Sequence, residues 1–224
     1  MANFAVDPAL VRPLVPRGVE IDFWNGRTYL SLVGFMFLDT RVMGVAVPGH
    51  RDFEEVNLRF YVRYKAEEGW RRGVTFVREI VPRRTITAVA NALYNENYIT
   101  MPMRHELAPG LARYEWKHAG RWNRVEARTS GDPCALVVGS EAEFITEHYW
   151  GYTAQRDGGT IEYKVEHPPW LVWPDPVVSY DVDGAAIYGP EFGRVLEGNP
   201  TSAFLAEGSP VVVFRGRRLP TGRR

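Results

Sequence analysis

The run FEEVNLRFYVRY, residues 53–64, alternates apolar and polar side chains more regularly than any other part of the chain. Successive side chains of a strand point to opposite faces, so the run predicts one strand with two chemically different faces. The apolar face is formed by Val56, Leu58, Phe60, Val62 and Tyr64. The opposite face carries Glu55, Asn57, Arg59, Tyr61 and Arg63. Alternation alone does not say whether this polar face points to water or into a concavity.

Composition narrows the class of protein. The chain has 224 residues and 45% hydrophobic side chains, enough for a sizeable core in one domain over residues 1–224. With 27 basic and 27 acidic residues the net charge is zero, so we expect no nucleic-acid or membrane partner. No signal peptide is evident, and no segment approaches the ~20 apolar residues of a membrane span. The basic tail, residues 216–224, is predicted to fray.

Cysteine usage suggests a compartment. Cys134 is the single cysteine, which excludes a disulfide within the chain and a cysteine-based zinc site. This usage suits a reducing environment, so we expect a cytoplasmic protein.

The remaining pattern predicts many short strands and few helices. Helices are expected over residues 7–15, 85–94 and 140–148, the last opened by a capping box of Ser140 and Glu143. Strands are expected over 19–23, 28–38, 53–64, 74–81, 98–105, 111–118, 122–128, 150–155, 160–167, 177–182 and 211–215. The turn signal Asn25-Gly26 favours a hairpin between the predicted strands 19–23 and 28–38. Such a pattern predicts a mainly β (α+β) domain, closed or nearly closed to protect its edges.

Motifs of serine hydrolases, dinucleotide-binding folds and phosphate-binding loops are absent from the sequence, and its five histidines are scattered. We therefore predict no cofactor and no metal site. His167 falls among inward apolar side chains, as either a hydrogen-bonded core residue or part of a pocket wall. Tyr94 ends the second predicted helix, and Tyr98 and Met101 follow it; all three would either pack in the core or line a pocket.

Five segments in order resemble the YqjF-like family of uncharacterised bacterial proteins. They are FEEVNLRFYV, RRGVTFVREIVPRR, YNENYITMPM, SEAEFITEHYWGYT and VEHPPW. The resemblance covers about residues 3–214 and implies no established activity. Members of the family usually have a further segment upstream, including an aromatic strand. Either the start of this chain is internal to the gene product, or the first strand of the family is missing here.

That family is similar, more distantly, to acetoacetate decarboxylase. The resemblance implies a cone-shaped antiparallel β-barrel with a few short helices and a buried pocket. It also implies that the polar face points inward, because Glu55 is similar to a pocket carboxylate of the decarboxylase. In that enzyme an Arg-Glu pair precedes Pro-Lys-Lys, whose first lysine forms a Schiff base.

The corresponding segment here is REIVPRR, residues 78–84, in which Arg83 stands at the position of the nucleophile. A guanidinium stays protonated and cannot form an imine at ordinary pH. The chain has three lysines, and all are predicted near turns, hairpin tips or polar faces: Lys65, Lys117 and Lys164. The resemblance therefore implies the barrel and argues against Schiff-base chemistry.

We expect a barrel pocket for a small polar or carboxylate-bearing organic molecule. If the protein is an enzyme, the chemistry would be acid–base catalysis on a carbonyl compound, with Glu55 as proton carrier and Arg59 or Arg83 as the anion's partner. Candidate catalytic residues are Glu55 and Arg83; candidate binding residues are Asn57, Arg59, Tyr61, Arg78, Tyr94, Tyr98, Met101 and His167. The alternative is a non-catalytic ligand-binding or structural protein, whose polar face is solvated or packs on another subunit. A homo-oligomer is compatible with both.

Overall fold

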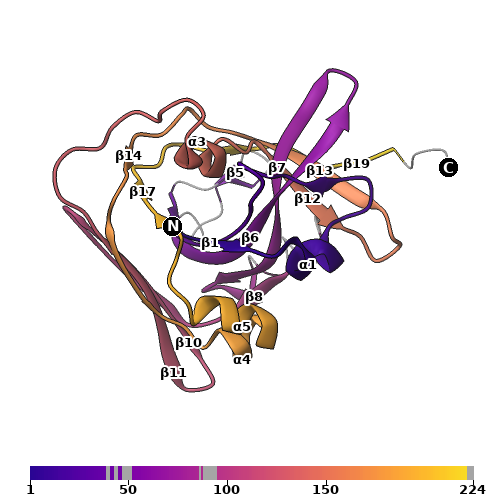
Figure 1. The fold of residues 1–224 in the computed structure, drawn as a ribbon. Coiled ribbons are helices and arrows are strands. Elements are labelled where there is room, and N and C mark those ends of the chain that lie inside the picture. Colours follow the sequence, from indigo (N-terminus) through magenta and orange to yellow (C-terminus); the bar gives the residue numbers. More distant parts are fainter. Residues whose placement is uncertain (39–40, 43–44, 47–51, 86, 88–94, 221–224) are drawn as a thin grey trace.

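The computed structural model describes residues 1–38, 41–42, 45–46, 52–85, 87 and 95–220. Most of its regular structure is β (Figure 1). The strands are β1 (Ala2–Val6), β2 (Glu20–Ile21), β3 (Thr28–Phe37), β4 (Arg41–Val42), β5 (Val45–Ala46), β6 (Phe53–Ala66), β7 (Gly69–Val81), β8 (Tyr98–Thr100), β9 (Met103–Ala108), β10 (Leu111–His118), β11 (Arg121–Arg128), β12 (Trp150–Ala154), β13 (Thr160–Glu166), β14 (Val172–Trp173), β15 (Val177–Asp181), β16 (Ser202–Ala203), β17 (Leu205–Ala206), β18 (Val212–Val213) and β19 (Arg217–Arg218). The helices are α1 (Pro8–Val11), the 3₁₀ helix η1 (Arg12–Leu14), α3 (Glu141–Thr146), α4 (Gly184–Tyr188) and α5 (Pro190–Leu196).

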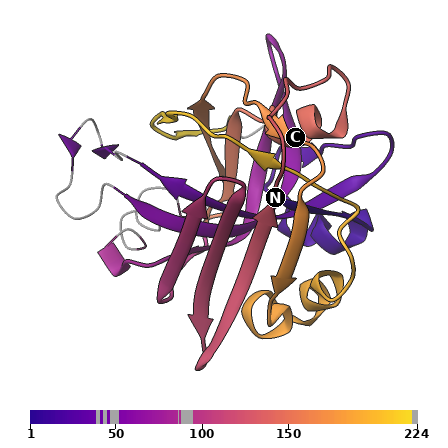
Figure 2. The same ribbon diagram turned by 90° about the vertical axis from the view of Figure 1, so that its left-hand side faces the viewer.

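The largest sheet has 11 strands and runs in the order β16-β1-β3-β6-β7-β12-β13-β18, with β2, β8 and β19 paired alongside. A second sheet of four strands, β15-β11-β10-β9, lies beside it together with α4 and α5 (Figure 2). The mainly β prediction is confirmed. Among the described strands, the path of the main sheet ends at β16 and β18, so its closure into a barrel stays a prediction.

Strand β6 is the long central strand of the main sheet, paired antiparallel with β3 on one side and with β7 on the other. Its apolar face is fully buried from Val56 to Val62: Leu58 and Phe60 have no exposed surface and pack in the core with Trp116 of β10. Gly34 of β3 lets the second sheet approach closely, because a Cβ there would lie 2.6 Å from Cδ2 of Tyr114.

The polar face of β6 is covered by α3. Tyr61 packs against Phe144 of this helix, with ring centroids 5.3 Å apart. The predicted cap forms at the start of α3: the Ser140 hydroxyl accepts from the amide of Glu143. The Glu143 carboxylate accepts from the amide of Gly139, one residue before the expected partner. Capping therefore fixes where α3 begins over the sheet.

The predicted hairpin at Asn25-Gly26 is wrong in its pairing, although the turn forms. Both turn residues have positive φ, +48° and +74°, as a tight turn of this kind requires. However, β2 pairs with β6, and β3 pairs with β1 and β6. The physical reason is that β3 is apolar on both faces and is most stable inside the sheet, between β1 and β6. Neither β1 nor the helices α4 and α5 were predicted.

The predicted fraying of the tail is wrong for residues 217–219. Strand β19 pairs with β13, and Arg217 forms an ion pair of 2.6 Å with the buried carboxylate of Glu162. Leu219 is buried. The buried negative charge on Glu162 attracts both Arg71 and Arg217, and this holds the segment on the sheet. Residues 221–224 lie outside the described part of the chain, as do 86 and 88–94 of the second predicted helix.

Candidate active site

The polar face of β6 is turned into the molecule. Glu55 and Asn57 are each 1% exposed, Tyr61 has no exposed surface, and Arg59 is half-buried. Water therefore does not solvate Glu55, Asn57 or Tyr61 on this face. Burying a carboxylate, an amide and a guanidinium carries a large desolvation cost, which the surrounding groups must offset. The alternating sequence left open whether the polar face points to water or inward, and in the structure it points inward.

Two further glutamates join Glu55. Glu79 of β7 lies directly opposite Asn57, so both side chains are on the same face. A β-bulge at the Leu58/Arg59 step of the β6–β7 ladder shifts the register just beyond this pair, so that Arg59 is opposite Phe76. Glu96 precedes β8, which pairs parallel with β7 and places Tyr98 beside Glu79.

Hydrogen bonds join these groups into one carboxyl cluster, which we define as Glu55, Glu79 and Glu96. The Asn57 amide donates to Oε1 of Glu55 at 2.9 Å, and the Tyr98 hydroxyl donates to Oε2 at 3.0 Å. The Tyr163 hydroxyl donates to Glu96. Glu79 and Glu96 hydrogen-bond to each other. Two carboxyl groups can bond in this way only when one of them carries a proton.

Burial changes the acidity of all three carboxyl groups. It raises the pKa of Glu55 to about 7, although the hydrogen bonds from Asn57 and Tyr98 oppose the rise. Burial also raises the pKa of Glu96 to about 7. Burial, followed by the negative charges of Glu96 and Glu55, holds the pKa of Glu79 well above its usual range. Carboxyl groups that titrate near neutrality can both donate and accept protons, as general acid–base catalysis requires.

Two buried acceptors of the site lack donors. Oδ1 of Asn57 and Oε2 of Glu79 have no hydrogen-bond partner among the described residues. Each such atom costs about 1–3 kcal/mol relative to a satisfied one. Unsatisfied buried acceptors at a site rich in perturbed acids are typical of a place where a ligand binds.

Arg59 supplies a cation on the same strand. One of its terminal nitrogens, Nη2, donates to the carbonyl oxygen of Ile145 in α3 at 3.3 Å. Its Nε is buried and has no partner within the described part of the chain. The guanidinium is 5.6 Å from the centre of the Tyr61 ring. Arg59 therefore keeps a free donor, whereas the Tyr61 hydroxyl is already bonded to Ser31 at 2.7 Å.

Beyond Tyr61 the same face holds a buried imidazole that sequence reasoning missed. Nε2 of His148 lies 3.3 Å from Oδ2 of Asp22, and Nε of Arg72 lies 2.7 Å from the same oxygen. Burial lowers the pKa of His148 to about 4, so it is neutral near pH 7. The Tyr61 and His148 rings are 4.8 Å apart. The charged pair of Asp22 and Arg72, to which His148 is bonded, and the packing of the His148 ring on Tyr61 together anchor α3 to the sheet.

Several predicted site residues lie away from the cluster. Arg78 is on the opposite face of β7, where it donates to the carbonyl of Ile187 in α4. Met101 is in the core. His167 lies beyond the end of β13, stacked on Trp170 at 4.0 Å. These three placements contradict the predicted pocket roles, because neighbouring strand residues face opposite sides and His167 follows the last paired residue.

The other two candidates lie in or beside the segment that follows β7. Arg83 is half-buried just past the strand, where its carbonyl oxygen accepts from the amide of Thr87 at 3.3 Å. Tyr94 lies outside the described residues. Their predicted roles remain predictions.

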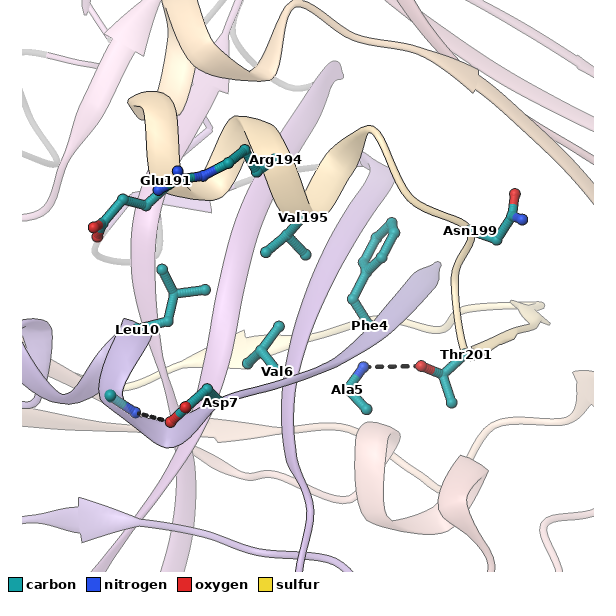
Figure 3. Close-up of a pocket in the computed structure, with 11 residues that line it drawn as sticks. Phe4, Ala5, Val6, Asp7, Leu10, Glu191, Arg194, Val195, Asn199 and Thr201 are labelled. Atoms are coloured by element: carbon teal, nitrogen blue, oxygen red, sulfur yellow. Dashed lines mark hydrogen bonds between the residues drawn. The ribbon is translucent and has the colours of Figure 1, made fainter.

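Two open grooves lie elsewhere on the surface. One, of about 570 Å³, runs between β1, α1 and α5; Phe4, Val6 and Val195 lie along it (Figure 3). The other, of about 610 Å³, is lined by residues of β15, α4 and the segment after α5. Neither is lined by the carboxyl cluster. In the first, the Asp7 carboxylate already caps α1 and Thr201 accepts from the amide of Ala5, whereas Glu191, Arg194 and Asn199 also line it.

The described residues contain no group of three or more His, Cys, Asp or Glu side chains arranged to hold a metal ion. None of the helices in the described ranges has the length and apolar composition needed to cross a membrane.

Solved structures define the fold class as that of acetoacetate decarboxylase-like proteins. Acetoacetate decarboxylase from Legionella pneumophila matches with a TM-score of 0.65 and 12% identity, over 98% of this chain and 83% of that one. The enduracididine biosynthesis enzyme MppR, complexed with pyruvate, matches with a TM-score of 0.63 and 11% identity, over 97% and 86%. An acetoacetate decarboxylase-like enzyme from Sphingomonas wittichii has a TM-score of 0.58 and 12% identity, over 98% and 89%.

Within that fold class, the chain belongs to DUF2071, a family of uncharacterized conserved proteins whose model matches residues 1–210. The uncharacterized protein YqjF of Bacillus subtilis is 31% identical over 178 residues, which are 76% of this chain and 70% of that protein. The family resemblance predicted from the five sequence segments is confirmed.

Proposed function

We propose that the polar face of β6 binds a small oxo acid and promotes acid–base chemistry at its carbonyl group, within a main sheet curved into a barrel. The observation that carries the proposal is one buried strand face that bears both a carboxyl titrating near pH 7, Glu55, and a guanidinium with a free donor, Arg59. A carboxylate ligand matches the fork of Arg59. Asn57, between them, holds Glu55 in position.

The proposed step is proton transfer without a covalent intermediate. The ionised Glu55 takes a proton from the carbon beside the carbonyl, and the electron pair of that C–H bond moves through the carbon onto the carbonyl oxygen. The resulting enolate is stabilised by the nearby positive charge of Arg59. Return of the proton from Glu55 to carbon restores the oxo acid, so atoms and charge balance. Arg83 remains a candidate partner for the anion.

Structural relatives support the ligand class. One is named for acetoacetate and another was solved with pyruvate, and both of these ligands are oxo acids. Their low identity carries the fold only, so ligand class and mechanism are proposed here from the site's own groups. The lysines of this chain are poorly placed for imine chemistry: Lys65 and Lys117 are exposed, and Lys164 is paired with Glu166.

Binding is tested by thermal unfolding with pyruvate or acetoacetate. A ligand that binds only the folded state raises the melting temperature. We expect a rise for the wild type and none for Arg59→Ala. Arg63→Ala is the matched control, since Arg63 lies on the same strand but pairs with Glu20 near the surface. An equal rise in Arg59→Ala removes that residue from the site, and no rise in the wild type contradicts the proposal.

Turnover is tested separately, which distinguishes an enzyme from a non-catalytic binder. The wild type should accelerate deuterium exchange into the methyl group of pyruvate in D₂O, followed by proton NMR. Glu55→Gln should abolish the acceleration. Glu54→Gln should retain it, because Glu54 lies on the opposite face of β6 beside His105. Binding without accelerated exchange would assign the site to a ligand-binding protein.

A further inference from the structure

At the far end of the carboxyl cluster the neighbouring hydroxyl donors leave one carboxylate oxygen without a partner among the described residues. Glu79 and Glu96 share one hydrogen bond, and the Tyr163 and Thr153 hydroxyls donate to Glu96. Oε2 of Glu79 nevertheless has no partner within the described residues. Arg59 is close enough for its charge to favour the ionised form of Glu55. The cluster therefore has a positive side toward Arg59 and an acidic side at Glu79 and Glu96.

An independent atom points to the same missing partner. Oδ1 of Asn57 is an amide oxygen, not part of the acidic group, and it is also buried without a donor in the described structure. Asn57 lies directly opposite Glu79, so the two unsatisfied acceptors belong to adjacent, same-face positions. A single group bearing several N–H donors would satisfy both.

We infer that Glu79, Glu96 and Asn57 form a subsite for a cationic nitrogen of the ligand, an ammonium or guanidinium group. As a description of the substrate, this rests on the proposed function: the ligand would be an oxo acid with a basic side chain. Asn57 is two residues from Arg59, about 7 Å along the strand. That separation suits a short zwitterion whose carboxylate binds Arg59 and whose cation lies against Glu79.

The subsite also supplies selectivity. A cation loses its hydration when it enters a buried site, and the one ionised carboxylate of the Glu79–Glu96 pair offsets that loss. A ligand of the same shape with a methyl group in place of the ammonium would leave the buried acceptors unpaired. Sites of this kind reject analogues that lack the donor much more strongly than apolar pockets reject a missing methylene.

The test compares three probes by isothermal titration calorimetry at pH 8, where Glu55 is largely ionised. They are 4-aminobutanoate, pentanoate, in which a methyl group replaces the ammonium, and propylammonium, which lacks the carboxylate. The wild type should bind 4-aminobutanoate about tenfold more tightly than pentanoate, the factor that one charge-assisted hydrogen bond supplies. Glu79→Gln should reduce that factor to about one, whereas Glu54→Gln should retain it.

The probes separate this inference from the proposed function. Propylammonium should bind the wild type and Arg59→Ala equally, and Glu79→Gln weakly. If carboxylates bind through Arg59 but the ammonium gives no preference, the subsite is wrong and the oxo-acid proposal stands. If propylammonium binds through Glu79 but no carboxylate binds, the subsite stands and the oxo-acid proposal is wrong. Absence of propylammonium binding to the wild type, or binding unchanged in Glu79→Gln, overturns the subsite.

Discussion

Asn57 of β6 and Glu79 of β7 lie directly opposite each other, both are 1% exposed, and each has a side-chain oxygen with no donor among the described residues. A pair of apolar residues at these two positions would avoid the desolvation cost and add packing. Departures from local rules of this kind are expected at functional sites. The cost at these two adjacent positions therefore supports the proposed site.

Glu55 should make the protein less stable as the pH rises. Its pKa is about 7 in the folded state, above the 4.5 of a glutamate in water. From about pH 4.5 to 7 the unfolded chain loses this proton while the folded protein keeps it, so unfolding becomes progressively more favourable. The effect amounts to about 3 kcal/mol and levels off above pH 7. Glu55→Gln should remove this part of the pH dependence, measured by urea denaturation at pH 5 and pH 8.

Glu54→Gln is the control for that measurement and should keep the wild-type pH dependence. Glu79 and Glu96 also have raised pKa values. Their ionisation adds to the loss of stability with rising pH, in the wild type and in Glu54→Gln alike. Identical slopes for wild type and Glu55→Gln would show that Glu55 is ionised in the folded protein at pH 5.

Local patterns predicted much of the sheet, because alternation depends only on neighbouring residues. The run at 53–64 was identified as a strand, and β10 and β11 were predicted within one residue of their ends. Of the carboxyl cluster only Glu55 was predicted as a site residue, since Glu79 and Glu96 join it through the β6–β7 and β7–β8 pairings. Pairing between distant segments leaves no periodic signal, although Glu79 did stand in the Arg-Glu pair that resembled the decarboxylase.

His148 should remain neutral well below the usual range of histidine. Burial lowers its pKa to about 4, although Asp22 favours the charged form. The unfolded chain gains a proton on this residue as the pH falls below about 6.5, while the folded protein does not, so stability is lost between about pH 6.5 and 4. Proton NMR of the imidazole should give a midpoint near 4. A midpoint near 6.5 would show that His148 is solvated.

Gly34→Ala should destabilise the contact between the two sheets. The new methyl carbon would lie 2.6 Å from the Tyr114 ring, closer than side chains can approach. Overpacking of this kind costs about 1–3 kcal/mol, measured as the free energy of unfolding in urea. The smaller residue in Tyr114→Leu should relieve the clash, so the double variant should lose less than the sum of the two single losses. Additive losses would mean that the two residues are not in contact.

Arg83 and the positions of the lysines predict that the protein forms no Schiff base with acetoacetate. An imine requires a neutral amine, which proteins obtain by desolvating a lysine or placing it beside another cation. Lys164 is partly exposed and bonded to Glu166, and Lys65 lies over the Trp70 ring at an exposed position. Borohydride added with acetoacetate should therefore leave the intact mass of the chain unchanged. Arg83→Lys places an amine at the position of the decarboxylase nucleophile and serves as the matched comparison. A mass increase in the wild type, mapped to any of its three lysines, would overturn the assignment of non-covalent acid–base chemistry.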